Sequence, residues 1–157
     1  MSHRRLLALS TILLLAAIPV LAAPNFSGTW KLNVKKSDFG EMQQMAPDSM
    51  TRTITHEDPK LKVHTKQSSQ MGEFETDATY TTDGKECTNE MMGNPVKSTV
   101  KWDGDALVID SKGTFGDNEV TIHQRWVLSA DGKTMNVTQK FSSSMGEGEA
   151  KLLFEKQ

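Results

Sequence analysis

The chain has 157 residues, with 18 basic and 20 acidic side chains and a formal net charge of −2 at pH 7. This balance argues against nucleic acid as a partner, because nucleic-acid-binding domains present a basic face. Cys87 is the only cysteine, which excludes a disulfide within the chain.

Residues 1–22 have the pattern of a secretory signal peptide. Arg4 and Arg5 precede an apolar run from Leu6 to Leu21, and Val20-Leu21-Ala22 provides a small-residue cleavage site. Cleavage after Ala22 would leave residues 23–157 as a single mature domain. The short signal favours a bacterial exported protein, either periplasmic or secreted. No later apolar run approaches the roughly 20 residues that a transmembrane helix needs.

The rest of the chain alternates short strand-like segments with turns. Phe26–Val34 is the first expected strand. Lys36–Ser49, rich in Met, Gln, Asp and Pro, is expected to be a loop with room for a short helix. Turn dipeptides then recur every 10 to 15 residues, which is the spacing of a strand plus a turn. They are Asp58-Pro59, Met71-Gly72, Asp83-Gly84, Gly93-Asn94, Asp103-Gly104, Gly116-Asp117, Asp131-Gly132 and Met145-Gly146.

Two-residue loops at four of these turns bring apolar residues opposite one another. The predicted pairs are Ile54 with Val63, His56 with Leu61, Tyr80 with Cys87, Val100 with Leu107, Leu128 with Met135, Trp126 with Val137 and Ile122 with Phe141. This agreement predicts about ten antiparallel strands in up-and-down order, with one apolar and one polar face. Such a sheet hides its edges by pairing its first strand with its last, so an all-β barrel is the predicted fold. A β-sandwich is the alternative, because turn spacing fits both.

The segment Asn25–Leu32 contains Gly28-Thr29-Trp30. It resembles the first strand of the calycin superfamily, the lipocalins and fatty-acid-binding proteins. In those families the Trp closes one end of the barrel and the Gly leaves room for a neighbour, which implies the same structural role for Gly28 and Trp30. The resemblance extends over the whole mature chain. It is closest to small exported lipocalin-like proteins of bacteria and more distant to fatty-acid-binding proteins.

The chain departs from the fatty-acid-binding proteins at two places. Those proteins carry a helical hairpin as a lid after the first strand, where this chain has only Lys36–Ser49. They also hold the ligand carboxylate with an Arg-x-Tyr on the last strand, and the matching positions here are Leu152 and Phe154. The resemblance therefore implies a ligand-binding barrel without implying fatty acid as its ligand.

On the face of the predicted sheet that points into the barrel, four residues are polar: Arg52, His56, Gln124 and Gln139. An unbonded polar group in a dry core costs on the order of 1–3 kcal/mol, so these residues predict a cavity. Apolar wall would come from aromatic side chains, as in other ligand pockets. The predicted ligand-binding residues are Arg52, His56, Tyr80, Trp102, Gln124, Trp126, Gln139 and Phe141. The alternative is a barrel without a ligand, in which Arg52 stacks on Trp30 and the two glutamines bond to each other.

Nothing in the sequence indicates catalysis, a cofactor or a specific metal site. Common catalytic motifs are absent, and the alternating Glu73, Glu75 and Asp77 have outward parity. His56 is expected to face inward and His64 outward, so these two cannot share an ion.

Three functional hypotheses follow. The leading one is an exported, monomeric lipocalin-like barrel, not an enzyme, that binds a small hydrophobic or amphipathic molecule in its interior. The alternative is an envelope interaction module that contacts another protein through the Met-rich loop. The second alternative is periplasmic copper handling through Met and His side chains, since thioether ligands suit Cu(I).

Overall fold

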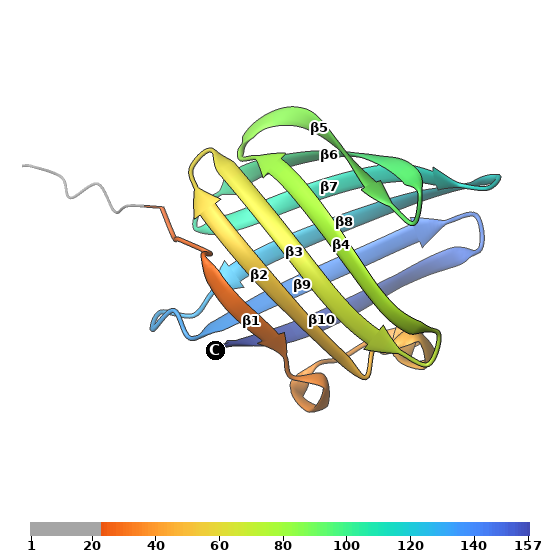
Figure 1. Ribbon diagram of the computed structural model, residues 1–157, viewed down its shortest axis with the longest axis horizontal. Helices are drawn as coiled ribbons and strands as arrows, with labels where there is room; N and C mark the ends of the chain where they lie inside the picture. The colour runs from red at the N-terminus through yellow and green to blue at the C-terminus, as the bar shows by residue number, and fades with distance from the viewer. Residues whose placement is uncertain (1–22) are drawn as a thin grey trace, which may run out of the picture.

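The computed structural model describes residues 23–157, so the predicted signal peptide at 1–22 lies outside the described residues (Figure 1). Ten antiparallel strands form one sheet in the order β4-β3-β2-β1-β10-β9-β8-β7-β6-β5. The strands are β1 (Gly28–Leu32), β2 (Ser49–Glu57), β3 (Lys60–Ser69), β4 (Gly72–Thr81), β5 (Asp83–Met91), β6 (Asn94–Asp103), β7 (Ala106–Phe115), β8 (Asn118–Leu128), β9 (Thr134–Ser143) and β10 (Gly146–Lys156).

The predicted fold class is confirmed: the chain is an all-β, up-and-down barrel in which β1 pairs with β10. The first strand is shorter than predicted, because the chain before Gly28 folds inward and buries Phe26 in the core. The expected short helix is a 3₁₀ helix, η2 (Gly40–Met45), preceded by a single 3₁₀ turn, η1 (Val34–Lys36). η2 lies against β10, and its Met42 Cγ is 3.2 Å from the point where a Cβ on Gly148 would lie.

The barrel is left open between β4 and β5, which share no backbone ladder (Figure 1). The side-chain amide of Asn89 spans this gap. Its Oδ1 accepts from the Thr79 backbone N–H at 2.8 Å, and its Nδ2 donates to the Thr79 carbonyl at 3.1 Å. The predicted pairing of Tyr80 with Cys87 is therefore wrong. The pairing of β5 with β6 is irregular between Asp83 and Glu86, and an irregularity of this kind bends a strand.

Most of the other predicted pairs are confirmed. Residues face each other as expected across the β2–β3 turn and along the whole β8–β9 hairpin. The pairing of Val100 with Leu107 is wrong: Val100 pairs with Ile109, and Leu107 pairs with Trp102. The turn lies one residue later than assumed, which slips the register by two residues. A two-residue slip keeps every side chain on its predicted face.

The core fills one half of the barrel. We call the end with the β2–β3, β4–β5, β6–β7 and β8–β9 turns the closed end, and the end with η2 and the other four hairpins the open end. Fully buried apolar residues lie near the closed end: Trp30, Phe26, Phe154, Leu61, Leu107, Met135, Val100 and Val137. Toward the open end, the inward-facing Gln67, Phe74 and Ile122 are only half-buried, whereas Val96 and Ser98 on β6 are buried. Part of the open half of the interior is therefore accessible to solvent.

Gly28 and Trp30 lie together in the closed half. Trp30 is fully buried, and its Nε1 donates to the Phe26 carbonyl at 2.9 Å. Gly28 has a φ of +135°, and a Cβ there would lie 2.7 Å from Lys156 Cε. The Lys156 side chain thus passes over Gly28, and its Nζ lies 5.2 Å from the centre of the Trp30 ring. A side chain at position 28 would displace this cation from the ring.

Candidate ligand-binding site

Arg52 on β2 is the most unusual residue of the interior. It is only 7% exposed, and its Cζ lies 4.8 Å from the Phe154 ring centre and 5.1 Å from that of Trp126. Its Nε and Nη1 have no hydrogen-bond partner among residues 23–157. Burial lowers the pKa of Arg52 from its ordinary value to about 10, so the guanidinium remains cationic at neutral pH. The barrel thus holds a buried cation whose hydrogen-bonding groups are not satisfied.

Tyr80 on β4 is the titratable neighbour of this cation. Burial raises the pKa of the Tyr80 phenol, and the positive charge of Arg52 opposes that rise. The phenol is therefore neutral at pH 7 and provides no counter-anion for Arg52. Its hydroxyl can still donate or accept a hydrogen bond.

The two inward-facing glutamines belong to a chain of hydrogen bonds that begins at Trp126. Trp126 Nε1 donates to Gln124 Oε1 at 2.8 Å, and Gln124 Nε2 donates to Gln139 Oε1 at 2.9 Å. This arrangement matches the glutamine pairing of the ligand-free alternative. Arg52, in contrast, stacks between Trp126 and Phe154 and not on Trp30 as that alternative proposed. The hydrogen bonds fix the Trp126 ring on which the guanidinium rests.

His56 and Trp102 form a separate group near the closed end. The buried His56 accepts a hydrogen bond at Nδ1 from the Phe26 backbone N–H at 3.3 Å, and its ring lies 5.7 Å from that of Trp102. Asp58 Oδ1 accepts from Trp102 Nε1 at 3.0 Å and from Thr82 Oγ1 at 2.5 Å. These two hydrogen bonds hold the pKa of Asp58 below its usual value. His56 and Trp102 therefore brace the closed end.

The eight predicted residues thus do not form a single cluster. Trp126 stacks on the Arg52 guanidinium, Tyr80 is near enough to influence the pKa of Arg52, and the two glutamines adjoin Trp126 through hydrogen bonds. Phe141 lies farther along β9, where it pairs with Ile122 and Gly148.

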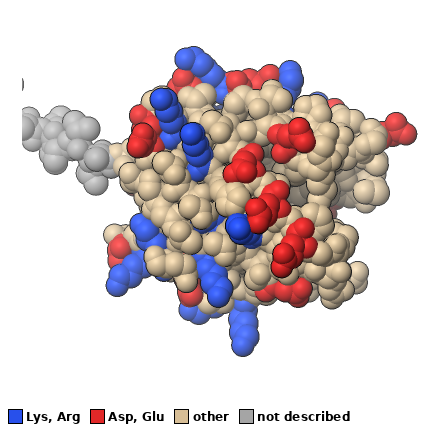
Figure 2. Space-filling view, in the orientation of Figure 1, with Lys and Arg blue, Asp and Glu red and all other residues tan. Residues whose placement is uncertain are grey.

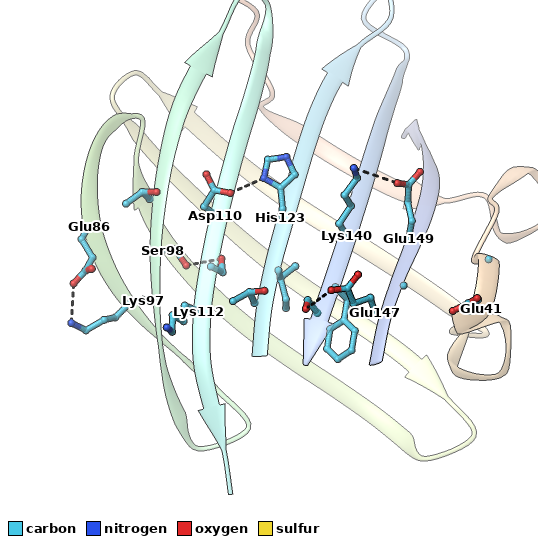
Figure 3. Close-up of a pocket in the computed structure, with 18 residues that line it drawn as sticks. Glu41, Glu86, Lys97, Ser98, Asp110, Lys112, His123, Lys140, Glu147 and Glu149 are labelled. Atoms are coloured by element: carbon cyan, nitrogen blue, oxygen red, sulfur yellow. Dashed lines mark hydrogen bonds and ion pairs between the residues drawn. The ribbon is translucent and has the colours of Figure 1, made fainter. Parts of the chain in front are cut away.

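A pocket of about 960 Å³ crosses strands β5 to β10 (Figure 3). Five residues that pair in sequence across these strands run through its middle: Ser98, Ser111, Ile122, Phe141 and Gly148. The outward-facing residues on either side of each also line the pocket, and η2 contributes Gly40 and Glu41. No residue of β1 to β4 lines it, so this transverse pocket lies along one wall of the barrel.

Six of the charged groups that line the transverse pocket are already paired with one another. Asp110 Oδ1 lies 2.6 Å from His123 Nδ1, Glu149 Oε2 lies 3.7 Å from Lys140 Nζ, and Glu86 Oε1 lies 3.1 Å from Lys97 Nζ (Figure 3). All six side chains are at least 43% exposed. Sequence reasoning missed this pocket, except for Phe141, because outward-facing charges resemble an ordinary solvated sheet surface. Among residues 23–157, the transverse pocket, unlike the surroundings of Arg52, contains no buried polar side-chain group that lacks a hydrogen-bond partner.

Potential metal ligands are dispersed. Within residues 23–157, no three or more His, Cys, Asp or Glu side chains are grouped so that they could hold a metal ion. His64 bonds Asp77 on the outer face at 2.7 Å, whereas His56 is buried. Met42 packs on the core and Met45 is 63% exposed. None of the helices in this part of the chain is long and apolar enough to span a membrane.

The fold has solved counterparts, although no protein-family model matches the chain. Zebrafish ileal bile-acid-binding protein, complexed with cholic acid, is similar with a TM-score of 0.58 and 18% identity, over 84% of this chain and 98% of that one. The fluorescent protein UnaG is similar with a TM-score of 0.57 and 21% identity, over 84% and 96% of the two chains. The fatty-acid-binding protein of Schistosoma mansoni, in complex with arachidonic acid, has a TM-score of 0.50 and 19% identity, over 84% and 96%. The chain therefore has the fold of the fatty-acid- and bile-acid-binding proteins of the calycin superfamily.

Proposed function

We propose that this protein binds a small amphipathic molecule inside the barrel and that Arg52 holds the anionic group of that molecule. The observation behind the proposal is a guanidinium that is 7% exposed, lies between two aromatic rings and has unsatisfied nitrogen atoms. A buried charge without a partner is strongly destabilising, so a bound anion would relieve a cost that the empty barrel bears. Carboxylate, sulfate and phosphate groups all match the planar donors of arginine.

The open half of the interior provides the place for the apolar part of the ligand. Its half-buried Phe74, Ile122 and Phe141 face inward from β4, β8 and β9. Ten methylenes at about 0.8 kcal/mol each would contribute about 8 kcal/mol, which corresponds to micromolar affinity before ordering costs. Two structures with this fold contain ligands that are apolar acids, cholic acid and arachidonic acid. Their chemistry is consistent with an apolar body and an anionic group.

We also propose that the protein is exported and acts by binding, not by catalysis. The predicted signal peptide supports export. Cys87 is a poor candidate for a reactive group, because burial raises the pKa of its thiol and its Sγ donates to the Ser98 carbonyl at 3.2 Å. A raised thiol pKa disfavours the thiolate, which is the nucleophilic form.

A displacement assay tests the proposal. Residues 23–157 are loaded with 1-anilinonaphthalene-8-sulfonate, which is then displaced by laurate or by 1-dodecanol, a neutral molecule of the same chain length. We expect laurate to bind with micromolar affinity and Arg52→Leu to weaken it at least about 30-fold, since a lost charged hydrogen bond costs about 2 kcal/mol. The affinity for dodecanol should change little.

Arg125→Leu is the matched control. Arg125 lies on the outer face of β8, is 42% exposed and pairs with Asp103. The same substitution there removes the same charge without touching the interior. Equal loss of laurate affinity in both variants would mean that only net charge matters. Unchanged laurate affinity in Arg52→Leu would refute the role assigned to Arg52.

A further inference from the structure

Methionines are concentrated in four of five segments that lie at one end of the barrel: in 37–51, 67–77, 86–96 and 141–150, but not in 113–122. Apart from Met1, the sequence has eight methionines, and seven of them fall in four of these segments. The exception, Met135, is fully buried in the core of the closed half. The concentration therefore does not follow from a general use of methionine as core filler.

The five segments meet at the open end of the barrel. Segments 67–77, 86–96, 113–122 and 141–150 contain the β3–β4, β5–β6, β7–β8 and β9–β10 hairpin turns, and 37–51 contains η2 and the start of β2. Because neighbouring strands are antiparallel, alternate turns lie at the same end of the sheet. Figure 1 shows these hairpins and η2 on the right-hand side, opposite the point where the described chain begins. We call these segments together the open-end rim.

Four rim methionines are exposed to a degree that is unusual for apolar residues. Met45 is 63% exposed, Met71 77%, Met92 67% and Met145 81%. Each lies in a different connection, so they are spaced around the mouth. Among residues 23–157, Val127 is the one other large apolar residue in this exposed class, at 36%. Exposed apolar side chains gathered at one functional end mark an interaction surface more often than isolated ones do.

The rim is also strongly acidic. Its five segments contain twelve of the chain's 20 acidic residues. Four of the twelve pair with lysines that lie immediately outside the segments: Glu75 with Lys66, Glu86 with Lys97, Glu119 with Lys112 and Glu149 with Lys140. Within residues 23–157, the other eight form no ion pair with a lysine or arginine. Examples at the turns are Glu73, Glu90, Asp117 and Glu147, all exposed. Figure 2 shows the same polarity on one face: acidic side chains predominate on the right, toward the open end, and basic ones lie mainly to the left and below. The field at the mouth therefore attracts cations.

The backbone at Met92 adds an independent observation. Met92 has a φ of 51°, in the left-handed region, and is the only non-glycine residue with positive φ among residues 23–157. It is followed by Gly93 with a φ of 75° in the β5–β6 turn. Asn-Gly is the preferred pair for a turn with two positive φ values. An exposed methionine at this position therefore costs stability that asparagine would not.

We propose that the open-end rim docks a cationic amphipathic helix of a partner protein. Methionine side chains are flexible and polarisable, so they adapt to an apolar helix face without a preformed groove. The surrounding carboxylates complement lysine and arginine on the flanks of such a helix and accelerate its encounter with the rim. A surface of anionic lipid does not fit, because the eight rim carboxylates that pair with no lysine or arginine among residues 23–157 would repel it.

The test measures binding of a fluorescent helix-forming peptide of leucine and lysine, of about 18 residues, which is five helical turns. A charge-reversed peptide of leucine and glutamate serves as the peptide control. We expect low-micromolar binding of the leucine–lysine peptide to residues 23–157, weakened by salt, and no measurable binding of the charge-reversed one. Arg52→Leu should bind the peptide like the unchanged protein, so the docking surface and the interior site can fail separately.

Two pairs of variants locate the surface. The Met45, Met71, Met92 and Met145 to Gln variant keeps all charges and should bind the peptide at least about tenfold more weakly, a loss of about 1.4 kcal/mol. Glu90→Gln with Asp117→Asn should weaken binding at low salt, whereas Glu57→Gln with Asp105→Asn, at the closed end, should not. All these side chains are exposed, and unfolding curves check that each variant is folded.

Three results would overturn the proposal. The first is equal peptide affinity in the open-end and closed-end double variants, which would mean that the peptide binds outside the rim. The second is equal binding of both peptides, which would indicate nonspecific apolar adsorption. The third is a stoichiometric Cu(I) complex that the methionine variant abolishes and that blocks the peptide, which would assign the rim to copper.

Discussion

Replacing Arg52 by leucine should make the ligand-free protein as stable as before or more stable, although it removes a side chain in the core. Burial lowers the pKa of Arg52 from its ordinary value to about 10. Since one pKa unit corresponds to about 1.4 kcal/mol, keeping the buried guanidinium charged costs on the order of 3 kcal/mol at neutral pH. Leucine removes this cost.

Two contributions oppose the gain. The guanidinium stacks against Trp126 and Phe154, and a cation–π contact contributes about 0.5–2 kcal/mol. Leucine is also smaller than arginine and leaves part of the space unfilled. The expected net change is therefore a gain of about 1 kcal/mol in the free energy of unfolding.

Urea unfolding at pH 7, followed by tryptophan fluorescence on protein stripped of ligand, measures this change. Arg125→Leu is again the matched control and should alter stability by less than about 1 kcal/mol, as expected for an exposed ion pair. A loss of more than 1 kcal/mol in Arg52→Leu, with Arg125→Leu unaffected, would show that Arg52 is a structural clamp between the two rings. The case for an anionic ligand would then lose its main support.

Three other predictions concern the scaffold. Trp30→Ala should cost about 3–5 kcal/mol in urea unfolding, as truncation of a large buried side chain does; a loss below 1 kcal/mol would remove its assigned role in the closed half. Met92→Asn should raise the free energy of unfolding by about 0.5–1 kcal/mol, because asparagine tolerates positive φ better; a decrease would refute the argument from the turn. The pKa of Asp58 is lowered in the folded state, so its stabilising effect is present above its unfolded pKa and is lost as pH falls below about 4. The free energy of unfolding of Asp58→Asn should therefore fall less between pH 5 and pH 3 than that of the unchanged protein. An equal fall in both proteins would contradict this.

The sheet was predictable because alternation of polar and apolar residues fixes which side chains face inward. The β8–β9 hairpin shows this most clearly: Leu128, Trp126, Gln124 and Ile122 all pair as predicted. The gap between β4 and β5 was not predictable, because it depends on a bend in β5 and on a side-chain bridge from Asn89. Asp83-Gly84 looks like any other hairpin turn in the sequence.

The candidate site was predictable in its residues but not in its partners. The alternation of the sequence placed Arg52 inside the barrel, where it has no acidic partner among residues 23–157. The rings on which it stacks, Trp126 and Phe154, come from β8 and β10, far along the chain. The pattern of nearby residues gives no reason to prefer these rings to Trp30. The open-end rim likewise depends on which turns share an end, and that information exists only once the strands are ordered.

Native mass spectrometry of the protein purified from its own host tests the central claim most directly. The account predicts one bound molecule of an anionic amphiphile per chain in the unchanged protein, retained in Arg125→Leu and lost in Arg52→Leu. Recovery of the unchanged protein with an empty barrel, or with a neutral lipid that Arg52→Leu retains equally, would contradict it.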